Sequence, residues 1–137
     1  MPSEFRLDGN ALRRTLTDAA TRLIREGQRL VIATARHRSP VDTGALRLSH
    51  RPGNITIRGT RVTGDVTAEQ DYAMAVHEGS RPHVIRPRRA QALTWGSGAD
   101  RVFARSVNHP GSSPRPWLLN SLKDVGPRLG FRVTPGD

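Results

Sequence analysis

The side chains in this sequence best suited to chemistry are three histidines with a neighbouring carboxylate. His77, Glu78, His83 and His109 are of the types that bind zinc. A zinc site needs three or four converging ligands, usually at short helical or hairpin spacings. His77 and His83 are separated by a glycine and a proline, which fits neither spacing. We therefore expect no metal site. The simpler interpretation pairs Glu78 with Arg81 and has the histidines hydrogen-bond loops.

Asp42, Thr43 and Gly44 form a triplet that also occurs in aspartic proteases. That chemistry uses two carboxylates sharing a proton, so it needs a second copy of the triplet by symmetry or duplication. The sequence has a single Asp-Thr-Gly. We expect a structural turn instead, in which Asp42 accepts backbone N–H groups and Gly44 supplies backbone freedom. Because no nucleophile is paired with a base, the sequence predicts no enzyme and no cofactor.

Arginine dominates the charge of the chain. Lys123 is the single lysine among 22 basic residues, and the net charge is +10. Arg86, Arg88 and Arg89 follow closely on Arg81 around two prolines, which predicts a stiff basic loop that contacts DNA phosphates or an acidic partner. A solvated basic face, and a genome-wide bias toward arginine codons, are the alternative explanations.

A long helix over residues 10–38 is the first element that would position these groups. Its apolar residues recur at spacings of three, four or seven: Leu12, Leu16, Ala19, Leu23, Leu30 and Ala33. Asn10 or Asp8 caps its start, and Pro40 stops it. Gly27 lies in the middle, costs about 1 kcal/mol relative to alanine, and permits a bend or a close crossing. This glycine also argues against the rival interpretation, a coiled coil.

The remaining elements are short. Alternation of Ile55, Ile57, Val62 and Val66 predicts a hairpin, and a helix is expected over 71–78 with Tyr72, Ala75 and Val76 inward. Further strands are expected at 48–50, 83–85, 92–95 and 101–107, and a last helix at 116–125. We predict one α+β domain over residues 1–137, with a long N-terminal helix packed through Leu12, Leu16, Leu23 and Leu30 on a small antiparallel sheet. Residues 1–9 and 127–137 are expected to be extended or ordered by a partner.

Composition limits what such a domain can do alone. Only 35% of residues are hydrophobic and 4% aromatic, so the core of a free monomer should be poor. The absence of cysteine excludes disulfides and thiolate metal sites. No apolar run is long enough to span a bilayer, so no membrane association is expected.

Three segments, taken together and in order, resemble one family. They are PVDTGALRLS (40–49), YAMAVHEGSRPHVIRPRRAQAL (72–93) and HPGSSPRPWLLNSL (109–122). Their order and spacing, over roughly residues 10–125, are similar to those of the neck and tail-completion family of long-tailed bacteriophages, also called minor tail components. One departure is His77-Glu78 before Gly79, where the family has an acid beside an aromatic or aliphatic residue.

The resemblance implies a structural virion protein made and assembled in the host cytoplasm. It would be a subunit of a cyclic ring of this chain that joins head to tail around the DNA channel. Its partners would be head-completion and tail-terminator or tail-tube proteins, with non-specific contact to genomic DNA. The ring order, six or twelve, stays open. A small basic nucleic-acid-binding protein is the alternative function.

The candidate subunit interface lies in two proline-stiffened loops and the aromatic residues near them. It comprises Tyr72, Glu78, Gly79, Arg81, Pro82, His83, Pro110, Pro116 and Trp117. Stiff loops lose less entropy on docking, which is why we expect the contacts there.

Overall fold

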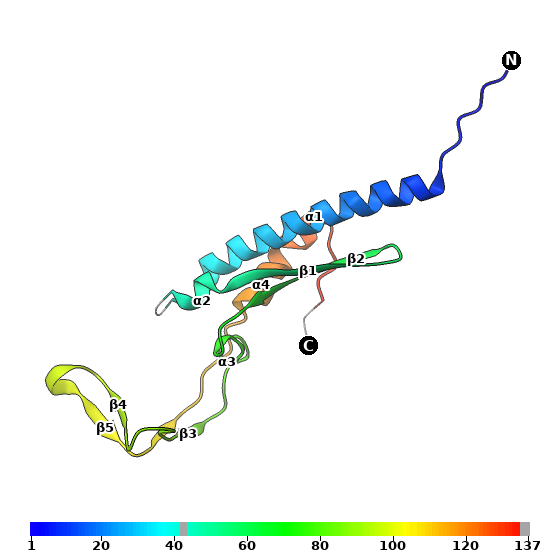
Figure 1. Ribbon diagram of the computed structural model, residues 1–137. Coiled ribbons are helices and arrows are strands. Elements are labelled where there is room, and N and C mark those ends of the chain that lie inside the picture. Colours follow the sequence, from blue (N-terminus) through cyan, green and yellow to red (C-terminus); the bar gives the residue numbers. More distant parts are fainter. Residues whose placement is uncertain (42–43, 135–137) are drawn as a thin grey trace. The chain divides into compact units, whose positions relative to one another are not determined.

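The computed structural model describes residues 1–41 and 44–134, and the chain divides into two compact units. Unit 1 is drawn from Met1–Ala73 and Pro116–Asp137, and unit 2 is Met74–Arg115. A long N-terminal helix, small antiparallel sheets and a short C-terminal helix confirm the α+β class (Figure 1). The expectation of a single domain stays a prediction.

Helix α1 spans Gly9–Arg38 and begins and ends close to where the sequence places it. Asp8, rather than Asn10, is the N-cap, and its carboxylate accepts the backbone N–H of Asn10 at 2.9 Å. The backbone N–H of Ser39 donates to the carbonyl of Ala35 at 2.8 Å and closes the last turn before Pro40. Local capping signals therefore define this helix.

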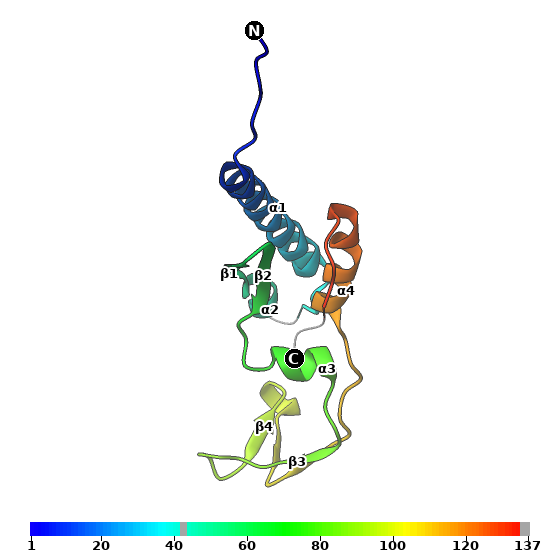
Figure 2. The same cartoon turned by 90° about the vertical axis from the view of Figure 1, so that its right-hand side faces the viewer.

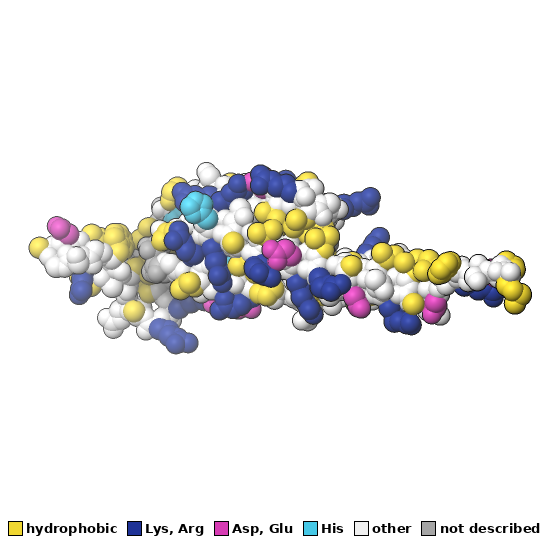
Figure 3. All heavy atoms as spheres, turned by 90° about the horizontal axis from the view of Figure 1, so that it is seen from above, with side chains coloured by type: hydrophobic (Ala, Val, Ile, Leu, Met, Phe, Trp, Pro, Cys, Tyr) yellow, Lys and Arg dark blue, Asp and Glu magenta, His cyan; other side chains and the backbone are white. Residues whose placement is uncertain are grey.

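The face that α1 buries is not the predicted one. Leu12, Leu16, Leu23 and Leu30 are 40%, 60%, 42% and 39% exposed, so their packing on the sheet was predicted wrongly. The buried residues are instead Gly27, Gln28, Val31, Ile32 and Ala35. These residues form a second stripe on the helix, and its small members allow close approach: a Cβ on Gly27 would overlap the ring of Phe131. Hydrophobic side chains accordingly lie uncovered along α1 between basic ones (Figure 3).

The hairpin below α1 consists of β1, His50–Arg58, and β2, Arg61–Ala68. The strands are antiparallel, with Ile57 opposite Val62, and the register shifts between Pro52 and Ile55. Gln28 of α1 fastens both strands, because its Nε2 donates to the carbonyls of Gly53 (3.1 Å) and Asp65 (2.7 Å). The buried side-chain amide of Gln28 thus sets the distance between α1 and the hairpin.

A short helix, α2, spans Ala45–Leu48, so that of the strand expected over 48–50 only His50, the first residue of β1, lies in a strand. That prediction is wrong because Ser49 ends a helical turn: its N–H and its hydroxyl both donate to the carbonyl of Leu46, at 3.1 and 2.8 Å. Gly44 precedes the turn with a φ of 83°, which fits its predicted structural role. Asp42 and Thr43 lie outside the described residues.

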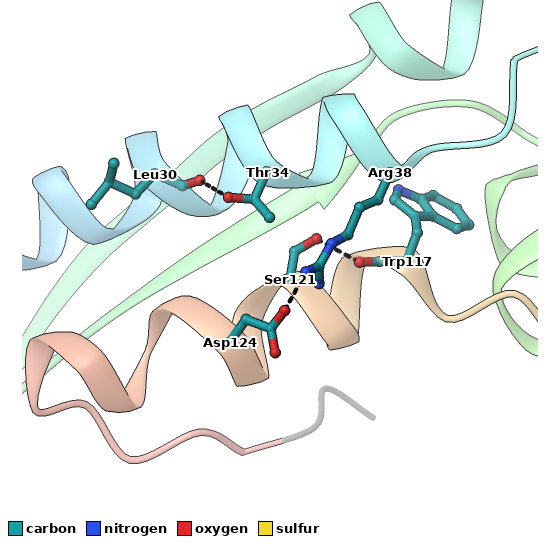
Figure 4. A network of polar contacts seen from close by, with 6 residues as sticks. All are labelled: Leu30, Thr34, Arg38, Trp117, Ser121 and Asp124. Atoms are coloured by element: carbon teal, nitrogen blue, oxygen red, sulfur yellow. Dashed lines mark hydrogen bonds and ion pairs between the residues drawn. The ribbon is translucent and has the colours of Figure 1, made fainter.

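Helix α4, Trp117–Val125, lies beside α1 and is followed by a 3₁₀ turn, η2, at Pro127–Leu129 (Figure 2). Trp117 is buried, and its Nε1–H donates to Nε2 of the fully buried His50 at 2.9 Å. Since Nε2 accepts, the ring proton of His50 is on Nδ1 and donates to the carbonyl of Arg47 at 3.0 Å. Arg38, in the last turn of α1, reaches across to form an ion pair with Asp124 (Figure 4).

Unit 2 holds only short elements. Helix α3, Ala73–Glu78, leads into it from unit 1. Strand β3 (His83–Ile85) pairs with β6 (Val107–His109), and β4 (Leu93–Trp95) pairs with β5 (Val102–Ala104), with a 3₁₀ turn, η1, at Gly98–Asp100.

Two predictions in this region are wrong. The expected single strand over 101–107 is divided between β5 and β6, which have different partners. Of the three residues expected to point inward, Val76 is half-buried, but Tyr72 is 43% exposed and Ala75 is exposed, whereas Ala73 is the buried residue of this helix. The inward face of this helix therefore includes Ala73 and Val76 but neither Tyr72 nor Ala75.

The buried tryptophan–histidine bond should be visible in stability. Trp117→Phe leaves Nε2 of His50 buried without a donor, which costs about 1–3 kcal/mol in the free energy of unfolding. Urea denaturation followed by the circular dichroism of the helices measures it. The matched control is Trp95→Phe, because Trp95 is 48% exposed; it should change stability by less than about 0.5 kcal/mol. Equal losses in the two variants would contradict the assignment.

Candidate interaction surface

Two chain segments of unit 2 are locked together at a pair of glycines. The backbones of Ser80 and Ser112 exchange hydrogen bonds of 3.0 and 2.9 Å, and their hydroxyls lie 3.0 Å apart. Gly79 and Gly111, beside these serines, have φ values of 79° and 85°. A Cβ on either would collide with the carbonyl of the opposite serine. The crossing therefore requires glycine at both positions, for conformation and for space.

The strands beyond this crossing bring two histidines together. His83 is opposite His109, and their rings stack with centroids 4.9 Å apart. His83 Nδ1 lies 2.8 Å from the carbonyl of Arg81, and His109 Nδ1 accepts the N–H of Gly111 at 3.0 Å. Both rings thus brace the loops around them. In the described part of the chain, no three His, Cys, Asp or Glu side chains are grouped as metal ligands would be.

The structure brings several of the predicted interface residues side by side. Gly79, Pro82, His83 and Pro110 all lie at the crossing or on the β3–β6 pair that follows it. Pro82, His83 and Pro110 are exposed. The two loops that the sequence singled out separately thus form one ridge, which we call the crossing ridge.

The other predicted interface residues are distributed differently. Glu78 and Arg81 are exposed, and they do not form the expected ion pair with each other. Tyr72, Pro116 and Trp117 belong to unit 1, where Tyr72 is largely exposed, Pro116 is half-buried and Trp117 is 5% exposed. Trp117 therefore acts first as a core residue of unit 1.

The arginines form the second part of the candidate surface. Arg86, Arg88 and Arg89 are exposed in the turn between β3 and β4, beside a shallow cleft that Leu93 also lines. Unit 2 carries seven arginines, all exposed, against the two carboxylates Glu78 and Asp100. Such a surface attracts phosphates or carboxylates.

Unit 2 has no residue in the buried class, although all of Met74–Arg115 is described. Its larger apolar side chains lie largely in solvent: Met74, Val84, Trp95, Val102 and Phe103 are 45–65% exposed. Isolated two-stranded pairs are marginally stable in water. Unit 2 therefore has little hydrophobic burial of its own to stabilise it. The sequence analysis did not identify these residues as exposed. The one indication was that the strands expected in this region have apolar residues but no amphipathic helix nearby in the sequence to cover them.

The glycine crossing generates a prediction. Gly79→Ala should open the crossing, because the new Cβ meets the carbonyl oxygen of Ser112, 2.5 Å away. Hydrogen exchange at the amides of Ser80 and Ser112 should speed up at least about tenfold, equivalent to a local loss of about 1.4 kcal/mol. Gly98→Ala is the control, since Gly98 has a φ of 59° but nothing within 4 Å of its Cβ position. Unchanged exchange in Gly79→Ala would show that the crossing does not need glycine.

Two further findings bear on the class of protein. Among the described helices, none is both long and apolar enough to cross a membrane. In the comparisons with known proteins, no family model, curated protein or solved structure matches the chain.

Proposed function

We propose that the protein is a structural subunit of a long-tailed bacteriophage virion, located in the neck and forming part of a ring that joins head to tail around the DNA channel. The observation that carries the proposal is unit 2, which has no buried residue and exposes both apolar and arginine side chains. A segment of this kind gains its stability in an assembly. The three sequence segments that resemble neck and tail-completion proteins supply the kind of assembly.

The crossing ridge is the contact that we assign to the next copy in the ring. A closed ring of identical subunits forms when one surface meets a different surface of the neighbour, head to tail. Pro82, Pro110 and the glycine crossing restrict the conformations of the ridge, so less entropy is lost when it docks. Tyr72, being exposed, is a further contact residue.

The arginines serve two kinds of anionic partner. Those facing the channel make weak contacts with DNA phosphates that carry no sequence information. The others pair with carboxylates on head-completion and tail-terminator or tail-tube proteins, where bidentate geometry fixes orientation. Arg86, Arg88 and Arg89 are the candidates for either role, because all three are exposed and none has an ion pair in the described chain.

A second candidate function is a small basic nucleic-acid-binding protein. The excess of arginine over carboxylate in unit 2 favours it. Against it, stacking on bases uses aromatic side chains, and only 4% of the residues are aromatic. The two functions differ in assembly state and in sequence selectivity, which the next two experiments measure.

The ring can be tested directly. Native mass spectrometry and negative-stain microscopy, with and without neighbouring virion proteins, should show a closed cyclic oligomer. Arg81→Glu, next to Pro82 of the crossing ridge, with Pro110→Asp should shift it to monomer while the circular dichroism of the helices stays unchanged, because neither side chain is buried. Arg58→Glu with Arg61→Glu, at the hairpin tip, is the control and should still assemble. A monomer under all these conditions would contradict the ring.

Binding to DNA separates the two functions. For the neck subunit, fluorescence anisotropy with two unrelated duplexes should give equal, weak affinities that fall steeply between low and moderate salt, because phosphate neutralisation releases counterions. Replacing Arg86, Arg88 and Arg89 by glutamine should flatten this salt dependence. Tight binding that discriminates between the duplexes and survives moderate salt would instead favour the nucleic-acid-binding protein.

A further inference from the structure

A groove lies between α1 and β1 in unit 1. It has a volume of about 660 Å³, within the range of ligand sites, and it is open along one side. Six residues of α1 from Arg25 to Arg36 form one wall, and four residues of β1 from Pro52 to Ile55 form the other. Helix α4 packs on a different side of α1 (Figure 2).

The groove is held open by hydrogen bonds. Gln28, at its base, is 7% exposed. Its side-chain amide is bonded to the carbonyl of Gly53 on β1 and to that of Asp65 on β2, at 3.1 and 2.7 Å. The two walls therefore keep their distance without a ligand. A preformed site of this kind loses little entropy on binding.

One wall of the groove carries three positive charges. Arg25, Arg29 and Arg36 follow one another at spacings of four and seven, which places them on one side of α1. No carboxylate lines the groove. Arg29 has one ion pair, with Glu26 at 2.9 Å, and this pair is at the surface, where such pairs contribute little.

Arg36 shows that these charges are incompletely satisfied. Its Nε is buried and has no hydrogen-bond partner in the described chain, and its Nη2 has only a long contact of 3.5 Å with the carbonyl of His50. An unsatisfied buried donor is unfavourable. A carboxylate that engaged the side of the guanidinium would accept from both nitrogens.

Apart from Gln28 and Asn54, the side chains that line the rest of the groove are apolar, which indicates the class of ligand. Ile32 and Ala33 line it from the helix, and Pro52 and Ile55 line it from the strand. A nucleic-acid backbone offers phosphates but no aliphatic side chains for such a surface. A peptide with acidic and aliphatic side chains offers both groups.

The acidic segment has to come from another protein. The twelve carboxylates of this chain are scattered, no two are adjacent in the sequence, and Glu69 and Asp71 are the nearest pair. A second copy, at a net charge of +10, has no acidic stretch to place against three arginines.

We propose that the groove between α1 and β1 binds an acidic segment of a partner protein, whose carboxylates pair with Arg25, Arg29 and Arg36 while an aliphatic side chain lies against Ile32 and Ile55. This site goes beyond the neck function and does not depend on it, since the groove lies wholly in unit 1 and apart from the crossing ridge.

The experiment uses the full chain and a short labelled peptide of glutamate, leucine and serine, followed by fluorescence anisotropy at moderate salt. The same peptide with glutamine for glutamate, and a labelled DNA duplex, are the comparison probes. The glutamate peptide should bind at least about tenfold more tightly than the glutamine peptide, because the modest contributions of several charge pairs add up. Heteronuclear NMR of the wild-type chain should show shifts at the Gln28 side-chain amide and at Arg36 Nε.

Arg25→Glu with Arg29→Glu should lower the peptide affinity at least about tenfold. The matched control is Arg13→Glu with Arg14→Glu, which makes the same change in charge on exposed residues of the same helix outside the groove. It should lower the affinity less than about threefold, the loss that screened long-range attraction alone produces. Should the groove variant be unstable, Arg25→Gln with Arg29→Gln and the NMR shifts test the same contacts.

Three results would overturn the proposal. Equal losses in the two variants would mean general attraction to a basic protein. NMR shifts away from Gln28 and Arg36 would place the peptide elsewhere. Duplex DNA that binds more tightly than the peptide and loses its affinity in the groove variant would make the site one for phosphate. Failure of the ring experiment leaves all three measurements unaffected, so the two proposals can fail separately.

Discussion

The hydrogen bond between Trp117 and His50 is the contact on which the rest of this structure depends. Both residues are buried, and the bond joins the start of β1 to the start of α4, 67 residues apart in the sequence. The whole of unit 2 is inserted between these two points of the chain. The bond, with the ion pair from Arg38 to Asp124, closes unit 1 around the two ends of that insertion. Contacts within unit 1 thus join the parts of the chain that precede and follow the insertion.

The core that this bond serves is small. The buried hydrophobic residues are Val31, Ile32, Ala35, Leu46, Ala73, Trp117 and Val125, and all of them belong to unit 1. A small core supports a small margin of stability, because hydrophobic burial must offset the conformational entropy of the ordered chain. Unit 2 adds ordered residues without adding buried ones. Unit 2 thus has little hydrophobic burial to offset the entropy of ordering its residues.

Local signals explain what the sequence could predict. The ends of α1, the hairpin and α4 depend on caps, alternation and prolines that act over a few residues, and the structure has them close to where these signals lie. The covered face of α1 depends on what packs against it, and a helical period does not show which of two apolar stripes is covered. Gly27 illustrates the difference. A larger residue there would overlap the ring of Phe131, which is far away in the sequence, so no local pattern explains the glycine.

The candidate surface, too, could be predicted from the sequence only where local residue types indicated it. Glycine and proline types indicated the loops of the crossing ridge, but their meeting through Ser80 and Ser112 is a long-range contact without a sequence signal. Arg25, Arg29 and Arg36 were visible only as part of the charge excess, because β1 forms the other wall of their groove.

Helix α1 therefore presents three different surfaces around its axis. One is buried on the hairpin and α4, one forms the arginine groove with β1, and one is the exposed stripe of Leu12, Leu16, Leu23 and Leu30. The arginine groove and the leucine stripe do not stabilise a monomer. Exposed leucines gain no free energy from burial, and clustered arginines repel one another. Both features would become favourable if apolar and acidic surfaces covered them, as the two proposals above require. The exposed leucines and clustered arginines of α1 are thus features of the same kind as the exposed apolar side chains and arginines of unit 2, and they occur in a different part of the chain.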